Sequence, residues 1–191
     1  MSDANGQTKD SKSMLAFWIV IGLAAVLLIV LLRGGLVSRS GFSGGLVPMN
    51  QRKAAPAFSL SKAGGSATVT QGEVSGKVVI LHFWATWCPP CRAEFPEFAK
   101  YASTIKESPD IVVLPVSLDE SPSAVPPFIQ KYGNGIDAYS DGGRLAQALG
   151  VASIPETIIL DKNGNVAYEA VGGQDWSAGG VPKLAEELSH E

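Results

Sequence analysis

Residues 77–105 read KVVILHFWATWCPPCRAEFPEFAKYASTI. The first eight form a nearly continuous run of apolar and β-branched residues, which is typical of a strand buried on both faces of a sheet. After Cys88-Pro-Pro-Cys91, apolar residues recur at helical spacing, and Pro89 suits the first turn of a helix. This stretch therefore predicts a central strand that runs directly into a helix, with a cysteine pair at the junction.

Strand and helix patterns alternate on both sides of this stretch. The later elements are a buried strand at 111–117, a helix at 124–132, a short helix at 144–150, a strand pair at 156–160 and 165–168 around a turn, and a helix at 181–189. Before the central strand, Phe58, Leu60 and residues 67–70 suggest a hairpin with its turn around 62–65. The order predicts an α/β sandwich with helices on both faces and an N-terminal β-hairpin extension.

The N-terminal part has a different composition. Residues 14–32 are 19 residues without a charge, enough for a helix to cross a membrane, and charged residues are only 17% of the chain. The alternative is a cleaved signal peptide, whose apolar run is shorter and ends in small residues. We expect an N-terminus at 1–13 on the cytoplasmic side, an anchor helix at 14–32, a Gly- and Ser-rich flexible linker at 33–55 and a folded domain at 56–191.

Charge and cysteine number exclude several classes of function. The first 53 residues carry six Lys and Arg against two Asp and Glu, and the rest carry nine against sixteen. An acidic domain without a basic stripe argues against nucleic-acid binding, which depends on neutralising phosphates. Two cysteines are too few for a disulfide-stapled scaffold or a multi-cysteine metal cluster.

The cysteine pair is the strongest chemical signal in the sequence. A thiol at a helix N-terminus lies at the positive end of the helix dipole, which favours the nucleophilic thiolate. The spacing of Cys88 and Cys91 lets the two sulfurs reach disulfide distance. We interpret the pair as a dithiol that exchanges electrons, with Cys88 as the exposed attacking sulfur and Cys91 as the resolving sulfur.

Two other interpretations of the pair stay open. A zinc site would combine the cysteines with His82 or His190, which supplies only part of a tetrahedral set. A static disulfide would close so short a loop that its stabilising effect would be weak. We expect no metal and no cofactor beyond the redox-active disulfide itself.

The segment from Phe83 to Pro96, FWATWCPPCRAEFP, resembles the active-site segment of membrane-anchored, extracytoplasmic thioredoxin-like proteins of the TlpA, ResA and CcmG (DsbE) type. The resemblance covers about residues 54–189, with further matches at 55–60, 76–77 and 150–161. It implies a thioredoxin-like fold and thiol:disulfide oxidoreductase activity. Residues 91–94 and 155–157 are closer to the CcmG branch, whereas 116–119 and 173–176 are closer to TlpA.

The resemblance implies a substrate-binding edge beside the dithiol. Pro155 matches the family's cis-proline, and the backbone before it, here Ile154, pairs in the family with an extended substrate peptide. Trp87, next to Cys88, is expected to shape the rim of that surface. The alternative for Pro155 is an ordinary proline at the start of a strand.

Two further residues are candidates for proton handling. Glu94 matches the family's active-site glutamate and lies on nearly the same helix face as Cys91, where a carboxylate can shuttle the proton of that thiol. Its alternative is a solvated surface glutamate. His82 departs from the family, because thioredoxin has a buried aspartate there and many relatives an asparagine. A histidine at this position would tune the acidity of Cys91, or is a core imidazole with satisfied hydrogen bonds.

The implied function is a thiol:disulfide reductase with one membrane span, facing the periplasm or outside of a bacterial cytoplasmic membrane. Implied clients are apocytochrome c or a copper chaperone of cytochrome oxidase assembly. The implied electron donor is a transmembrane thiol carrier of the CcdA or DsbD type, because no nucleotide or flavin fingerprint is present. Pro90 removes a donor near the sulfurs, which favours a less oxidising pair. The same residues would suit a disulfide oxidase or isomerase, and a non-catalytic peptide-binding module of this fold is a third interpretation.

Overall fold

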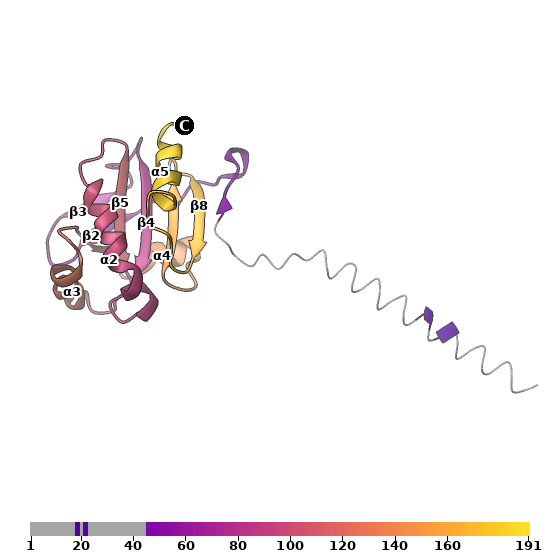
Figure 1. Ribbon diagram of the computed structural model, residues 1–191, viewed down its shortest axis with the longest axis horizontal. Helices are drawn as coiled ribbons and strands as arrows, with labels where there is room; N and C mark the ends of the chain where they lie inside the picture. The colour runs from indigo at the N-terminus through magenta and orange to yellow at the C-terminus, as the bar shows by residue number, and fades with distance from the viewer. Residues whose placement is uncertain (1–17, 20, 23–44) are drawn as a thin grey trace, which may run out of the picture. The chain divides into compact units, whose positions relative to one another are not determined.

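The computed structural model describes residues 18, 19, 21, 22 and 45–191 (Figure 1). The strands are β1 (Gly45–Leu46), β2 (Ser59–Lys62), β3 (Thr68–Thr70), β4 (Val78–Trp84), β5 (Ile111–Ser117), β6 (Tyr139–Ser140), β7 (Glu156–Leu160) and β8 (Val166–Val171). The helices are α2 (Pro89–Thr104), α3 (Val125–Tyr132), α4 (Arg144–Leu149) and α5 (Val181–Ser189), with short 3-10 helices at Met49–Gln51 and Pro122–Ala124.

The described strands form one sheet in the order β1-β8-β7-β4-β5-β6-β2-β3. β4 lies inside it, parallel to β5 and antiparallel to β7. All seven residues of β4 are buried, as its continuous apolar run predicts. Because successive side chains of a strand point to opposite faces, β4 contributes to two separate cores.

Helices cover both faces of the sheet, which confirms the predicted α/β sandwich. On one face, α2, α3 and α5 pack against the even-numbered residues of β4, and Figure 1 shows α2 and α5 lying across that face. On the other face, α4 packs against the odd-numbered residues. His82 therefore faces α2, the helix that carries the cysteines.

The predicted N-terminal hairpin is present. β2 and β3 pair antiparallel with Leu60 opposite Val69, and β2 joins the sheet through β6. Gly64 in the turn has φ +74°, a conformation that glycine adopts without steric cost. β6 was not predicted, because two residues are too few to show an alternating pattern.

The segment from Gly45 to Ala55, expected to be part of a flexible linker, is bound to the domain. β1 pairs antiparallel with β8, and Ala54 forms a bridge with Asn165. Arg52 donates to carboxylates 109 and 139 residues further along the chain. The linker prediction is therefore wrong for this part of the chain. The sequence did not reveal the contacts, because contacts over such distances leave no local pattern.

The expected anchor at 14–32 lies outside the described residues, apart from four positions that are helical. The expected N-terminus at 1–13 lies wholly outside them. In the part of the chain that the structure describes, no helix is long and apolar enough to cross a membrane. The anchor stays a prediction.

Candidate active site

The junction between β4 and α2 carries both cysteines. Cys88 is the N-cap residue of α2, with an extended backbone (φ −84°, ψ 111°). Its sulfur accepts a hydrogen bond from the backbone N–H of Cys91 at 3.3 Å. Pro89 and Pro90 occupy the next positions, where an N–H would have no partner within the helix. The sulfur of Cys88 therefore lies at the positive end of α2, which favours the thiolate when the pair is reduced.

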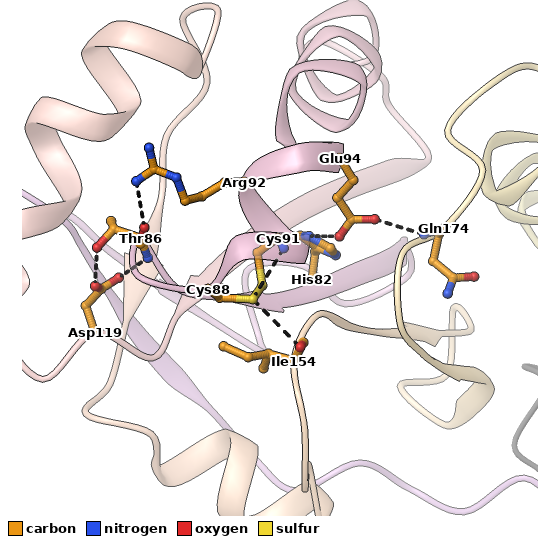
Figure 2. Close-up of a disulfide and its surroundings, with 9 residues drawn as sticks. All are labelled: His82, Thr86, Cys88, Cys91, Arg92, Glu94, Asp119, Ile154 and Gln174. Atoms are coloured by element: carbon orange, nitrogen blue, oxygen red, sulfur yellow. Dashed lines mark hydrogen bonds and ion pairs between the residues drawn. A yellow bond between two sulfur atoms is a disulfide. The ribbon is translucent and has the colours of Figure 1, made fainter.

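The two cysteines form a disulfide, with their Cα atoms 5.3 Å apart (Figure 2). Cys91 is fully buried, and Cys88 is 3% exposed. The expectation of an exposed attacking sulfur is therefore only partly correct. Cys88 is the cysteine with some access to solvent, but the access is narrow because the carbonyl oxygen of Ile154 lies 3.7 Å from its sulfur.

The loop opposite the disulfide has the predicted geometry. The Ile154–Pro155 peptide bond is cis. The carbonyl of Pro155 accepts a hydrogen bond from the N–H of Gly172 at 2.7 Å, which fixes the loop to the end of β8. Trp87, which precedes Cys88, is 63% exposed. Of the three predicted substrate-binding residues, Trp87 therefore presents an exposed indole just before the attacking cysteine. Ile154 and Pro155 form the backbone segment that contacts the sulfur of that cysteine.

Glu94 and His82 form a buried pair between α2 and β4 (Figure 2). Nε2 of His82 lies 3.2 Å from Oε1 of Glu94, whose side chain is 9% exposed. Nδ1 of His82 lies 3.1 Å from the hydroxyl of Thr157 on β7, and the imidazole packs against Phe98. Glu94 is therefore not a solvated surface residue. His82 is both a core imidazole and the direct partner of the predicted catalytic glutamate.

The loop between β8 and α5 completes the surroundings of Glu94. The backbone N–H of Gln174 donates to Oε2 of Glu94 at 2.8 Å, and the indole N–H of Trp176 donates to the same oxygen at 3.4 Å (Figure 2 for Gln174). Trp176 is buried, and its ring packs against Phe98 and Tyr101. The sequence did not predict this contact, because the loop lies about 80 residues after Glu94.

A second buried carboxylate holds the loop that precedes Cys88. Asp119, just after β5, accepts hydrogen bonds from the backbone N–H and the hydroxyl of Thr86 and from the hydroxyl of Ser117. The guanidinium of Arg92 donates to the carbonyl of Thr86 at 3.1 Å (Figure 2). These bonds fix the backbone two residues before the attacking cysteine. In the sequence, Asp119 stands out only through the family resemblance of residues 116–119, and this role of its carboxylate was not predicted.

Glu156 adds a titratable group behind the cis-proline loop. It directly follows Pro155 and is 2% exposed. Burial, and then the nearby carboxylate of Glu169 on β8, raise the pKa of Glu156 to about 7. The charge of this residue therefore changes near neutral pH, two positions from the backbone that contacts Cys88.

This combination of a sheet flanked by helices, a helix-capping disulfide and an opposed cis-proline defines a dithiol oxidoreductase with a thioredoxin-like fold. The sequence matches the Redoxin family over residues 50–188, and the chain belongs to that family. With its relatives, this makes the protein a thiol-disulfide oxidoreductase of the ResA and DsbE type, with Cys88 and Cys91 as its Cys-x-x-Cys pair.

The similar proteins include the thiol-disulfide oxidoreductase ResA of Bacillus thuringiensis (strain Al Hakam). It is 30% identical over 155 residues, which cover 80% of this chain and 88% of ResA. The thiol:disulfide interchange protein DsbE of Pseudomonas fluorescens biotype C is 31% identical over 119 residues, covering 61% of this chain and 64% of DsbE.

Solved structures agree on the fold. A secreted thiol-disulfide isomerase from Corynebacterium glutamicum has a TM-score of 0.70 at 23% identity, over 81% of this chain and 96% of that one. That likeness shows the fold alone. A putative DsbE from Chlorobium tepidum has a TM-score of 0.62 at 28% identity, over 72% of this chain and 96% of that one.

Proposed function

We propose that the chain reduces specific protein disulfides on the outer side of a bacterial cytoplasmic membrane. The Cys88 thiolate attacks a client disulfide, so that a Cys88–client S–S bond forms and the client S–S bond breaks. Cys91 then loses its proton and attacks the Cys88 sulfur, and the second client thiolate leaves. Both client thiolates take up protons. The client gains two electrons, and the dithiol becomes the Cys88–Cys91 disulfide.

One observation supports a reductase over an oxidase: few hydrogen-bond donors surround the Cys88 sulfur. Among the residues described, one backbone donor reaches it, the N–H of Cys91. Pro89 and Pro90 have no N–H to offer. A strongly stabilised thiolate makes a dithiol an oxidant, as in DsbA, so a sparsely stabilised one favours a reductant.

The clients and the electron donor rest on the family resemblance. Apocytochrome c, or a copper chaperone in cytochrome oxidase assembly, would be the oxidised client. A membrane thiol carrier of the CcdA or DsbD type would return electrons to the disulfide. A helix at 14–32 would keep the domain beside such a carrier, and an oxidising compartment would supply clients with disulfides.

Trapping tests the assigned roles of the two cysteines. Cys91→Ser is expected to accumulate a mixed disulfide between Cys88 and the client, because the resolving thiol is missing. Cys88→Ser is expected to give no covalent complex and no disulfide reduction. Complexes formed by Cys88→Ser instead would reverse the roles.

Two further measurements test direction and location. A reduction potential for the pair near that of thioredoxin, about −270 mV, supports a reductase, whereas one near that of DsbA, about −120 mV, supports an oxidase and overturns the proposal. In intact spheroplasts, added protease is expected to digest the domain. Full protection of the domain would place it on the cytoplasmic side.

A further inference from the structure

His82 and Glu94 face each other in the core through one ring nitrogen and one carboxylate oxygen. Nε2 and Oε1 are both buried and lie 3.2 Å apart, and within the described residues neither has a well-aligned hydrogen bond, to the other or to a third group. Two lone pairs facing each other at this distance repel, so the contact is attractive only when a proton lies between the two atoms. The hydroxyl of Thr157 occupies the other ring nitrogen. The pair, built from β4 and α2, is therefore suited to take up a proton.

This unit shares its helix face with the resolving cysteine. Cys91, Glu94 and Phe98 follow one another at spacings of three and four residues, which places them on one side of α2. His82 contacts two of the three, Glu94 and Phe98, the latter with ring centroids 4.3 Å apart. Figure 2 shows His82 and Glu94 joined beside the first turn of α2. Cys91 is fully buried, so water does not readily take its proton.

The β8–α5 loop decides which oxygen of Glu94 faces His82. The N–H groups of Gln174 and Trp176 both point to Oε2, which leaves Oε1 for the imidazole. The side chain of Gln174 is itself held, by the hydroxyl of Tyr168 at 3.1 Å and by the carbonyl of Gly172 at 2.8 Å. The loop thus reaches the carboxylate in a fixed orientation.

The loop also approaches the carboxylate very closely at Gly173. A Cβ added to Gly173 would lie 3.3 Å from Oε2 of Glu94, which is tighter than an ordinary carbon–oxygen contact. With alanine at this position, the carboxylate would have to move by a few tenths of an ångström. The absence of a side chain at Gly173 therefore helps to keep the carboxylate of Glu94 in its position.

We propose that Gln174 and Trp176 are positioning residues of the dithiol site, which hold Glu94 against His82 so that the pair accepts the proton of Cys91. In the resolving step the S–H bond of Cys91 breaks and its proton passes to the pair. The Cys91–Cys88 bond then forms, and the Cys88–client bond breaks with the client thiolate leaving. This inference rests on the exchange reaction proposed above and assigns its proton acceptor.

Two other titratable groups near the pair, both tyrosines, keep their protons at neutral pH. Burial, and then the charge of Glu186, raise the pKa of Tyr101, which packs on Trp176, to about 12. Burial also raises the pKa of Tyr168, which bonds Gln174. Thr157 on β7 does not titrate, and Arg92 on α2 bonds the carbonyl of Thr86. Among the groups named in this paragraph, Cys91 is the one whose proton the proposed exchange reaction removes.

Trp176→Phe is the sharpest test, because it removes one N–H donor to Glu94 and keeps an aromatic ring in the same packing. Trp84→Phe is a matched control. Trp84 is also fully buried, and its indole N–H has no hydrogen-bond partner among the residues that the structure describes. Both variants lose an indole from the same core, and one of them changes the surroundings of Glu94.

The readout is the reaction of the reduced full-length protein with Ellman's reagent. The first release of thionitrobenzoate reports the attack of Cys88, and the second reports the attack of Cys91 on the mixed disulfide. Trp176→Phe is expected to slow the second release about 2- to 10-fold at neutral pH. It also moves the midpoint of that release's pH profile upward, because a carboxylate with one donor fewer binds a proton more tightly. The first release keeps its rate.

Gly173→Ala is a second variant, expected to shift the same profile, and it decides the question if Trp176→Phe does not fold. A profile for the second release that is the same in Trp176→Phe, Gly173→Ala and Trp84→Phe would overturn the positioning role. Failure of the wild-type protein to release thionitrobenzoate twice would instead overturn the dithiol function itself.

Discussion

The guanidinium of Arg52 lies 3.2 Å from the carboxylate of Asp161, across 109 residues of sequence. Asp161 is buried in the β7–β8 turn and also accepts hydrogen bonds from the backbone N–H groups of Asn163 and Asn165. The segment around Arg52, which leads into the domain, is therefore joined to the sheet through a buried ion pair. We expect this ion pair to stabilise the folded state.

Arg52→Gln is expected to lower the free energy of unfolding by about 1–3 kcal/mol, because it leaves a buried carboxylate without its cationic partner. The measurement is the denaturant midpoint. Lys183→Gln is the control. Its ion pair with Glu187 is exposed, with a separation of 3.6 Å, and is expected to contribute less than about 1 kcal/mol. Equal losses in the two variants would show that Arg52 does not stabilise the docked segment.

Elements that bury an apolar face were predictable from local sequence. The bounds of β5, β7 and α5 match the expected ones, because each has a periodic or continuous apolar pattern. The reactive core of the site was predictable for another reason. Cys88 and Cys91 carry their chemistry in their spacing, and the family resemblance supplied Pro155 and Glu94.

The polar contacts that hold the site in place were not predictable. Gln174 reaches Glu94 through its backbone N–H, which any residue at that position would offer. Thr86 follows the end of β4 and Asp119 follows the end of β5. Nothing in either segment of sequence indicates that these two residues are hydrogen-bonded. Such contacts form only when the chain folds, so no local sequence pattern predicts them.

Glu94→Gln tests whether this side chain handles a proton or only supports the fold. The amide oxygen can still accept from the N–H groups of Gln174 and Trp176, and the amide NH₂ can face His82, so thermal stability is expected to change little. The resolving step at Cys91 is expected to slow at least about 10-fold and to lose its wild-type pH dependence. His82→Asn is expected to lose stability as well, because it removes a packed ring. A Glu94→Gln profile that overlays wild type would leave the glutamate without a proton role.

Asp119→Ala tests the bonds that fix the loop before Cys88. Removing the carboxylate leaves the N–H of Thr86 and the hydroxyl of Ser117 without their acceptor, which is expected to cost about 1–3 kcal/mol of stability. The first reaction of Cys88 with Ellman's reagent should slow, because its loop is no longer held. Asp119→Asn should have a smaller effect, since its amide oxygen can keep one set of these bonds. Wild-type reactivity of Cys88 in Asp119→Ala would show that the loop keeps its position without Asp119.

Glu156 gives the protein a pH-dependent stability. Burial and the neighbouring Glu169 raise the pKa of Glu156 to about 7 in the folded state, against about 4.3 for an unfolded glutamate. The folded state therefore binds this proton more tightly than the unfolded state. The resulting stability is fully present below about pH 4 and is lost as the pH rises through about 7. We expect this residue to lower the free energy of unfolding by roughly 1–3 kcal/mol across that interval.

Glu156→Gln keeps the shape and the capacity to donate to Glu169 but cannot ionise, so the fall in stability between about pH 4 and pH 7 is expected to shrink relative to wild type. Chemical denaturation at a series of pH values measures the difference between the two proteins, in which all other titrating groups cancel. Glu107→Gln, at an exposed position, serves as the control and should follow the wild-type curve. If Glu156→Gln also follows that curve, the pKa of Glu156 is not raised in the folded state, and the cis-proline loop has no neutral carboxyl behind it near pH 7.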